Sequence, residues 1–419
     1  MKFEDLNLHP TLLKAIKDQN YTQPTAIQER AIPIILKKND VLGSAQTGTG
    51  KTAAFALPIL HHLINEKEQT GKKRIRTLVV TPTRELAIQI GENFTDYSKY
   101  NDISNTVIFG GVKQGNQTNI LKRGVDVLVA TPGRLLDLMG QGYISLNDVK
   151  YFVLDEADRM LDMGFIHDIK KLLEKLPKQR QSLFFSATMP KTILELSNTI
   201  LQNPQKVEVH QTSTTAETIQ QYIYYTNKSS KKDLLFHILD NQEIQQILVF
   251  SRTKHGADRI VRNLKQNNID AAAIHGDKSQ NQRQRALKSF KDHELRVLVA
   301  TDIAARGIDI DHLSFVLNYD IPNEPETYVH RIGRCGRAGK EGISISISDA
   351  EENAYVRDIE KLINKKIKEV IENPFVQTDK PMTTKEKKEF EKEKNRKQQE
   401  FFQNRNKRGG GNRGGGNRR

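Results

Sequence analysis

The amino-acid sequence predicts an α/β fold in which parallel sheets are flanked by helices, arranged as two domains. Short apolar runs alternate with helical segments twice along the 419 residues, once on each side of a polar stretch at Gln211–Thr215. Apolar runs bounded by turn residues are typical of strands buried in a parallel sheet. The length points the same way, because one domain takes about 150 residues. We expect a first domain over residues 1–205, a linker over 206–218 and a second domain over 219–370.

The first stretch, residues 3–28, has helical spacing interrupted by a turn at Tyr21–Thr25. A glutamine side chain offers one acceptor and two donors, which suits the edge of adenine, so Gln28 is a candidate for reading that base. Tyr21 is a candidate for stacking on it. Packing and helix capping are the alternative roles for both residues.

A glycine-rich loop follows, and the rest of the chain is organised around it. Residues 41–52 read VLGSAQTGTGKT, an apolar lead-in followed by closely spaced glycines and a Lys-Thr pair that opens a helix. Glycines allow successive N–H groups to face one anion, and the helix N-terminus favours the same charge. Lys51 is expected to reach the β- and γ-phosphates of a nucleotide, and Thr52 to hold Mg²⁺. The other candidates for the phosphate cradle are Ala45, Gln46, Thr47, Gly48, Thr49 and Gly50.

Ala45 stands where the first glycine of such a loop is usual, and it still permits a close approach of the backbone. The alternative is a glycine-rich turn that binds nothing. Because Lys-Thr directly follows the glycines, a nucleoside triphosphate site is the interpretation that the pattern favours.

Hydroxyl, glycine and arginine residues follow the next predicted strands, at 77–80 and 125–130. Ligands of open α/β sheets bind at the carboxyl ends of the strands, so these loops are expected to form a second surface for a polyanion. Ordinary turns between strands and helices have similar residues and are the alternative. The candidates are Arg84, Gly110, Gly111, Thr131 and Arg134.

A strand predicted at 150–154 runs directly into Asp155, Glu156 and Asp158. Three carboxylates at a strand end repel one another unless cations compensate them, and a magnesium nucleotide supplies that compensation. Asp155 is expected to hold the metal through water, and Glu156 to orient or deprotonate the attacking water. An acidic helix N-terminus, stabilised by the helix dipole, is the alternative.

Two hydroxyl side chains are expected to connect this acidic cluster to the interface between the domains. A strand predicted at 182–185 ends at Ser186 and Thr188. Both residues can hydrogen-bond Asp158.

The second domain repeats the alternation, with strands expected at 246–250, 271–274 and 296–300. No phosphate loop recurs there, so this domain is not expected to hold a triphosphate in the manner of the first.

Three arginines in the second domain, Arg331, Arg334 and Arg337, recur at intervals of three and are expected on roughly one helical face. Clustered cations need an anion opposite them. A γ-phosphate held by the other domain is one candidate, which would make Arg334 and Arg337 arginine fingers. Salt bridges and contacts to nucleic-acid phosphates are the alternatives.

Composition limits the classes of function. The net charge of +14 suggests a polyanionic partner, and the absence of a conspicuous basic amphipathic helix favours nucleic acid over a membrane surface. The single cysteine, Cys335, excludes an internal disulfide and fits a reducing compartment. We found neither a signal-peptide pattern nor an apolar run of about 20 residues, so we expect a cytoplasmic protein with no membrane association.

The segment 371–419 differs from the rest in composition. It contains 14 basic and 7 acidic residues, a net charge of +7 that is half of the total. From Asn404 onward it consists mainly of glycine, asparagine and arginine. Because it lacks an apolar face there, we expect a disordered basic tail that tethers nucleic acid, with a solvated end as the alternative.

Together these motifs resemble the ordered motif set of the DEAD-box ATP-dependent RNA helicases, most closely the bacterial RhlE-like branch. The resemblance covers Met1 to about Leu362. The stretches that carry it are Phe3 with Tyr21–Gln28, Ala45–Thr52, Pro82–Ala87, Thr131–Arg134, Asp155–Asp158, Ser186–Thr188, Thr301–Asp309 and His330–Arg337.

The resemblance implies two RecA-like domains that close over ATP, Mg²⁺ and RNA and locally separate short duplexes. It implies that Phe3 and Tyr21 lie against adenine beside Gln28, that Asp309 contacts the ribose, and that Arg334 and Arg337 contact the γ-phosphate. His330 joins Asp158, Ser186 and Thr188 as a candidate for coupling the domains. The RNA-binding set implied is Arg84, Gly110, Gly111, Thr131, Arg134, Arg252 and Thr301. Cys335 stands where many relatives have threonine.

The implied partner is structured or duplex RNA, ribosomal or messenger, and ribonucleoprotein or RNA-decay partners stay open. Two other functions compete with this one. A DNA-acting motor shares the two RecA-like domains and predicts equal stimulation of ATPase activity by DNA. A non-enzymatic RNA-annealing or clamping protein predicts that Glu156→Gln leaves cellular function intact.

Overall fold

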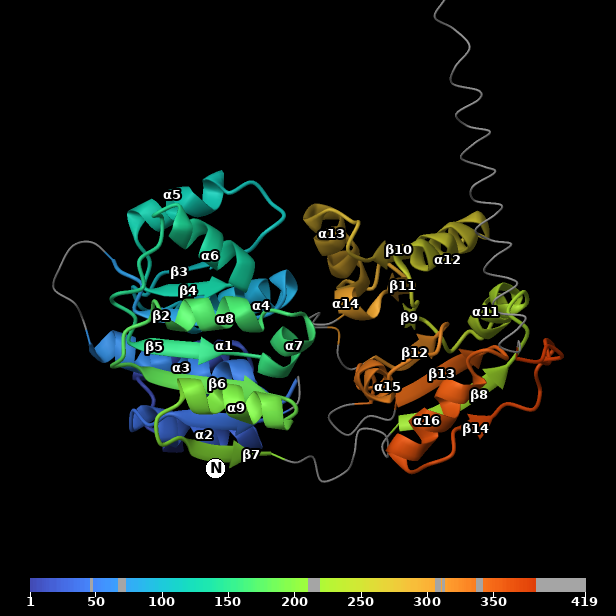
Figure 1. Ribbon diagram of the computed structural model, residues 1–419, viewed down its shortest axis with the longest axis horizontal. Helices are drawn as coiled ribbons and strands as arrows, with labels where there is room; N and C mark the ends of the chain where they lie inside the picture. Colours follow the sequence, from blue (N-terminus) through green and yellow to red (C-terminus); the bar gives the residue numbers. More distant parts are fainter. Residues whose placement is uncertain are drawn as a thin grey trace, which may run out of the picture.

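The computed structural model describes residues 1–45, 48–66, 73–209, 219–305, 310, 313–336 and 342–381. Two seven-stranded parallel sheets, each covered by helices on both faces, form two domains that lie side by side (Figure 1). This confirms the fold class that the sequence predicts. Among the described residues, no helix combines the length and the apolar character needed to span a membrane.

The first sheet has the strand order β3-β4-β2-β5-β6-β1-β7. The predicted strands are present because their valine, leucine and isoleucine runs are buried on both faces of the sheet. The strands are β1 (Val41–Ser44), β2 (Thr77–Val80), β3 (Asn105–Ile108), β4 (Val127–Ala130), β5 (Tyr151–Leu154), β6 (Gln181–Ser186) and β7 (Gln205–Glu208). β7 pairs with β1, so the first sheet continues to Glu208, into the segment where the sequence predicts a linker.

Helices cover this sheet on its two faces, and successive residues of β6 show the alternation. Leu183 and Phe185 pack with α2, α3 and α4, whereas Phe184 packs with α6, α8 and α9 on the opposite face. The helical elements are η1 (Phe3–Leu6), α1 (Pro10–Asp18), α2 (Ala26–Leu36), α3 (Lys51–Asn65), α4 (Arg84–Tyr97), α5 (Gly115–Arg123), α6 (Pro132–Gly140), α7 (Ala157–Asp162), α8 (Ile166–Leu173) and α9 (Lys191–Ile200).

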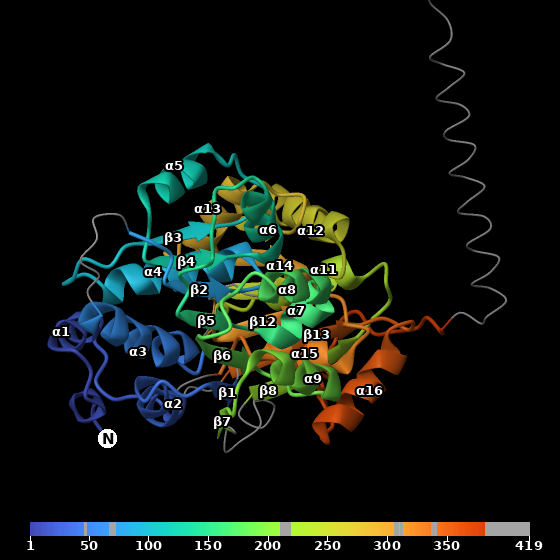
Figure 2. The same ribbon diagram turned by 60° about the vertical axis from the view of Figure 1, so that its left-hand side comes forward.

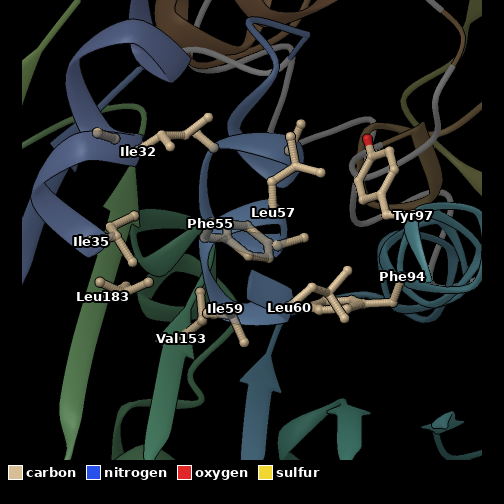
Figure 3. Close-up of a cluster of buried hydrophobic side chains, with 14 of the residues drawn as sticks. Ile32, Ile35, Phe55, Leu57, Ile59, Leu60, Phe94, Tyr97, Val153 and Leu183 are labelled. Carbon is tan, nitrogen blue, oxygen red and sulfur yellow. The ribbon is translucent and has the colours of Figure 1, made fainter. Parts of the chain in front are cut away.

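The central helix α3 packs within a cluster of buried hydrophobic side chains that includes Phe55 and Phe94 (Figure 3). Phe55 lies between Phe94 of α4 and Phe185 of β6, with ring centroids 6.4 and 5.6 Å away. All three side chains are fully buried. Because α3 begins at Lys51, this packing also fixes the helix end that follows the glycine-rich loop.

The second sheet has the order β10-β11-β9-β12-β13-β8-β14. Its strands are β8 (Ile219–Tyr225), β9 (Ile247–Phe250), β10 (Ala271–Ile274), β11 (Val297–Ala300), β12 (Phe315–Asn318), β13 (Gly342–Ser348) and β14 (Lys368–Glu369). Its helices are α11 (Lys231–Leu239), α12 (Lys254–Gln266), α13 (Gln280–Lys291), α14 (Asp302–Ala305), α15 (Pro325–Ile332) and α16 (Asn353–Ile363). In both views α13 lies near α6 and α15 near α7 (Figures 1 and 2).

The start of the predicted tail packs on the second domain instead of standing apart from it. Phe375 packs against the apolar cluster below α11 and meets the His237 ring edge-on at 6.4 Å. Its carbonyl accepts a 2.6 Å hydrogen bond from the Thr226 hydroxyl, and Gln377 donates to the Thr226 carbonyl at 3.0 Å. The expectation of a tail from residue 371 is therefore wrong for residues 371–381, and the remainder, 382–419, lies outside the described residues.

Candidate functional site

The glycine-rich loop connects β1 to α3. Gly48 and Gly50 have φ angles of 78° and 89°, which glycine adopts without strain. Lys51 is buried, and its Nζ donates to the Ala45 carbonyl at 2.9 Å, so its side chain turns back over the loop. Thr49 precedes it in the loop and Thr52 lies in the first turn of α3. Gln46 and Thr47, also predicted in the phosphate cradle, lie outside the described residues.

Gln28 ties α2 to this loop. Its Oε1 accepts from the Thr25 N–H at 2.9 Å, and its Nε2 donates to the Gly50 carbonyl at 3.1 Å. A Cβ added at Gly50 would lie 2.4 Å from that Nε2. The amide of Gln28 therefore caps α2 and positions the loop.

The two aromatic residues predicted to face adenine lie beside each other. The rings of Phe3 and Tyr21 are stacked, with centroids 6.2 Å apart. Phe3 is 3% exposed and Tyr21 is 39% exposed. Of this pair, Tyr21 presents the face that a base can reach.

The acidic cluster lies at the end of β5. Burial raises the pKa of Asp155 to about 6, Lys51 opposes that rise, and Glu156 adds to it. Glu156 has a φ of 55°, and its Oε2 accepts from Arg159 Nη1 at 2.7 Å. Both side chains of this ion pair are largely buried.

Asp158 is directed toward the loop after β6. Its Oδ2 accepts from the backbone N–H of Thr188 at 2.9 Å and from the Thr188 hydroxyl at 3.1 Å. The Ser186 hydroxyl accepts from the Asp158 N–H at 3.2 Å. The two hydroxyl contacts predicted from sequence are therefore present.

The donor set at Asp155 fits a magnesium ion. A buried carboxyl group whose pKa is raised by burial and by a neighbouring carboxylate is stabilised by a nearby cation. In the described part of the chain, no group of three or more histidine, cysteine, aspartate or glutamate residues could hold a metal. Magnesium suits this arrangement, because it is commonly bound by one or two carboxylates together with nucleotide phosphates and water.

A cavity of about 500 Å³ lies between the two domains. Four residues predicted to bind the polyanion line it: Arg84, Gly110, Thr131 and Arg134. The other lining residues are Pro82, Thr83, Glu85, Gly133, Asp137, Met163 and Phe165 from the first domain, and Gly276, Arg283, Ile303 and Ala304 from the second. The tertiary structure thus brings these four predicted polyanion-binding residues together at one cavity. It also adds lining residues to the cavity that were not predicted from the sequence.

The two glycines of the predicted pair have different surroundings. At Gly110, a Cβ would meet nothing within 4 Å. At Gly111, with a φ of 77°, it would lie 2.2 Å from Arg84 Nη1. Gly111 therefore makes room for the Arg84 guanidinium, whereas Gly110 leaves open space beside the cavity.

Arg134 lies in the first turn of α6, which follows β4, and Thr301 directly follows β11. Arg134 Nη2 donates to the Val112 carbonyl at 3.1 Å, and its Nε lies 3.4 Å from Asp137 Oδ2. The Thr301 carbonyl accepts from the N–H groups of Ala304 and Ala305 in α14, at 3.0 and 2.8 Å.

Arg252 is not among the residues that line this cavity. Its Nη2 is 2.5 Å from Glu352 Oε1 and donates to the Ile321 carbonyl at 2.7 Å. The same glutamate pairs with the buried Lys231. The structure thus places Arg252 in an ion-pair network of the second domain.

Arg331 and Arg334 do not share one helical face, so the prediction of a common face is wrong for these two arginines. α15 ends at Ile332, Gly333 is its C-cap, and Arg334 follows in a turn. Arg331 is buried and donates through Nε and Nη2 to Asp302 at 2.6 and 2.8 Å, a structural contact. Arg337 lies outside the described residues, as does Asp309, predicted at the ribose.

Arg334 and His330 lie at the boundary between the domains. Both line a small cavity together with Arg159 of α7, which pairs with Glu156. Arg159, a residue that no sequence motif singled out, thus lies between the acidic cluster and the cavity that His330 and Arg334 of the second domain line.

A second interdomain contact was also missed. Glu85 Oε1 accepts from Gln280 Nε2 and from Arg283 Nη2, each at 3.0 Å. In the sequence, the only indication of this contact was the acidic residue Glu85 near the start of a helix. The helix dipole alone explains an acidic residue there, so the indication was weak.

Two family descriptions match the chain: DEAD/DEAH box helicase over residues 25–196, and helicase conserved C-terminal domain over residues 230–339. The ATP-dependent RNA helicase CshA of Limosilactobacillus reuteri is 42% identical over 362 residues, which are 86% of this chain and 72% of that protein. The DEAD-box ATP-dependent RNA helicase RhpA of Helicobacter pylori strain B128 is 41% identical, over 89% of this chain and 75% of the relative. The structure is similar to S. cerevisiae Dbp5 bound to RNA and ADP BeF3, with a TM-score of 0.76 at 33% identity, covering 88% of this chain and 95% of that one.

Proposed function

The chain belongs to the DEAD-box family of ATP-dependent RNA helicases, and from that premise we propose which of its residues carry out RNA-stimulated ATP hydrolysis and the local separation of RNA strands. The observation that supports the assignment best is the division of charged groups between two domains. In the first domain, Lys51 begins α3 after the glycine-rich loop, and Asp155 and Glu156 directly follow β5. Arg334 approaches from the second, beside Arg159.

In the proposed mechanism, the first domain binds the nucleotide. The loop around Gly48 and Gly50 directs N–H groups at the phosphates, and Lys51 moves from the Ala45 carbonyl to the β- and γ-phosphates. Tyr21 offers its exposed face to adenine, and Gln28 presents its amide from the N-terminus of α2.

Hydrolysis is assigned to the acidic cluster. Asp155 and Thr52 would hold a magnesium ion, which neutralises charge on the phosphates when bound. Once its carboxylate is released from Arg159, Glu156 orients the attacking water and accepts a proton from that water. Arg334 and Arg337 stabilise the charge that develops on the γ-phosphate.

Coupling to RNA is assigned to the contacts between the domains. Asp158 bonded to Ser186 and Thr188 links the acidic cluster to the loop after β6, and His330 lies at the same boundary. Arg84, Gly110, Thr131 and Arg134 line the cavity that would receive one RNA strand. Gly111 and Thr301 support its walls. We retain Arg252 as an RNA contact only through a second conformation, since Glu352 pairs with it here.

We extend this proposal to the setting in which the protein acts. We propose, from the motif pattern, that it belongs to the RhlE-like branch and acts in the cytoplasm on structured or duplex ribosomal or messenger RNA. Ribonucleoprotein or RNA-decay factors are the proposed protein partners, and residues 382–419 the proposed RNA tether.

Two variants test the assignment. Lys51 contacts phosphate in the ground state and in the transition state, so Lys51→Ala should lose both ATP binding and turnover. Glu156→Gln should retain ATP and RNA but stall before hydrolysis. ATP binding by fluorescence titration and phosphate release, with and without RNA, measure the two effects. Parent-like hydrolysis by Glu156→Gln would remove Glu156 from the mechanism.

A further inference from the structure

A large aliphatic side chain lies exposed on the wall of the interdomain cavity. Ile303 is 68% exposed, whereas its neighbours in α14, Ala304 and Ala305, are 3% and 6% exposed. Ile303 lines the cavity that also contains Arg84 and Arg134. Most of the apolar surface of Ile303 therefore lies outside the core of its own domain and is available to a ligand.

The position of Ile303 is fixed by its neighbours. The Thr301 carbonyl accepts hydrogen bonds from the N–H groups of Ala304 and Ala305, at 3.0 and 2.8 Å. The carboxylate of Asp302 accepts hydrogen bonds from two nitrogens of the buried Arg331 side chain. These contacts hold the residues on both sides of Ile303.

The first domain contributes apolar groups to the same cavity. Met163 and Phe165 line it, and Phe165 packs partly against the core formed with α6 and α8. Gly164 between them has a φ of 78°, and the Phe165 N–H donates to the Met160 carbonyl at 2.9 Å. We call Met163, Phe165, Ile303 and Ala304 the apolar wall.

Three arginines also line the cavity, together with the carboxylates Glu85 and Asp137, which lie 3.0 Å from Arg283 Nη2 and 3.4 Å from Arg134 Nε. Arg84 and Arg134 come from the first domain and Arg283 from the second, and we call these three residues the donor wall. A nucleotide has the matching division, because its phosphate is charged while the faces of its base and ribose are largely apolar.

We propose that the apolar wall contacts the ribose or base faces of a single RNA strand whose phosphates lie against the donor wall. The inference rests on the proposed function and adds to it a contact that does not depend on charge. Burying Ile303 against a nucleotide contributes affinity through the removal of apolar surface from water. Such a contact releases no counterions, so its contribution does not change with salt.

The test is a titration of full-length protein with single-stranded RNA, with a non-hydrolysable ATP analogue present, at several salt concentrations. Ile303→Ala should weaken binding about tenfold, equivalent to about 1.4 kcal/mol, with the log–log salt slope of the parent. Ile303→Val should retain most of the affinity. Arg134→Ala should also weaken binding, but lower the slope by about 0.7, the value for one single-strand phosphate that a cation neutralises.

Leu362→Ala is the matched control, because this side chain is 46% exposed on α16 and does not line the cavity. It should bind as the parent does. Thermal unfolding and ATP affinity without RNA check that Ile303→Ala retains its fold. Repeating the titration with an abasic strand separates the two sources of contact: the penalty of Ile303→Ala disappears if the base is contacted and persists if the ribose is.

Parent-like RNA affinity of Ile303→Ala, with Arg134→Ala weakened, would overturn the inference and leave the proposed function standing. A lowered salt slope in Ile303→Ala would also overturn it, because the loss would then be electrostatic. If neither variant weakened binding, the assignment of this cavity to RNA would fail as well.

Discussion

The contact between Glu85 and the second domain predicts how firmly the two domains hold each other. Glu85 in α4 accepts from Gln280 and Arg283 of α13, each at 3.0 Å. The side chains of Glu85 and Arg283 are only 7% and 12% exposed, so solvent screens the ion pair weakly. Glu85→Ala should therefore shift the protein away from this arrangement of its domains.

The size of the shift follows from the two interactions that the Glu85 carboxylate makes. A hydrogen bond to a charged group contributes about 1.5–3 kcal/mol net, and removing one partner of a buried ion pair costs about 3–5 kcal/mol. The cost of losing the ion pair alone corresponds to a fall of about two to three and a half powers of ten in the ratio of this domain arrangement to other arrangements, at about 1.4 kcal/mol for each power. Glu85→Gln retains an acceptor for Gln280 and should produce a smaller shift.

Single-molecule energy transfer measures the distance between the domains in the absence of RNA and nucleotide. The native Cys335 is fully buried, so dyes can be directed to cysteines introduced at the exposed Glu174 and Lys265. Arg283→Ala and the double variant complete a mutant cycle. An unchanged distance distribution in Glu85→Ala would refute the reasoning, as would strictly additive effects of the two single changes.

Four further predictions concern hydrolysis, nucleotide choice, stability and RNA affinity. Arg334→Ala should slow RNA-stimulated phosphate release by about 10³-fold or more while ATP affinity without RNA changes little; a small effect on turnover would contradict its role as an arginine finger. Gln28→Ala should weaken ATP more than GTP in competition binding, because guanine presents the reverse donor and acceptor pattern and leaves groups unpaired at about 1–3 kcal/mol; equal weakening would exclude base reading. Burial raises the pKa of Asp126, but hydrogen bonds from Ser104 and Arg76 outweigh it and hold the pKa below its usual range, so Asp126→Asn should cost about 3 kcal/mol or more near neutral pH, and the difference from the parent in chemical denaturation should shrink as the pH falls below about 4. Deleting residues 382–419 should raise the RNA concentration needed for half-maximal ATPase activity and flatten the salt dependence by about 0.7 for each RNA phosphate that the tail neutralises, leaving turnover at saturating RNA unchanged; superimposable titrations would show that the tail binds no RNA.

The sequence alone predicted the features that depend on local chemistry. The glycines and the Lys-Thr pair of residues 41–52 specify a tight turn before a helix wherever they occur, and the structure has α3 beginning at Lys51. The apolar runs specify buried strands through side-chain burial, so the order of strands and helices around the loop was largely predictable. The bond between Asp158 and Thr188 could be anticipated because both residues follow adjacent strands of one parallel sheet.

The prediction from arginine spacing was wrong because the position at which one helix ends decides whether two residues share a helical face. Arg331 and Arg334 have the separation of neighbours on a helix, but α15 ends between them at Ile332. Arg331 then serves Asp302 inside the domain, while Arg334 faces the boundary. The prediction that the tail starts at residue 371 was wrong for a related reason. Phe375 packs against an apolar cluster formed by residues far away in the sequence.

Tertiary structure alone decided which distant side chains meet. Glu85 and Gln280 are 195 positions apart, and no periodicity connects them. The same holds for Phe165 and Ile303, which line one cavity from two domains. A local sequence pattern indicates the conformation of its own segment of backbone. Contacts between domains depend on the shapes and charges of two folded surfaces, and these surfaces exist only after each domain has folded.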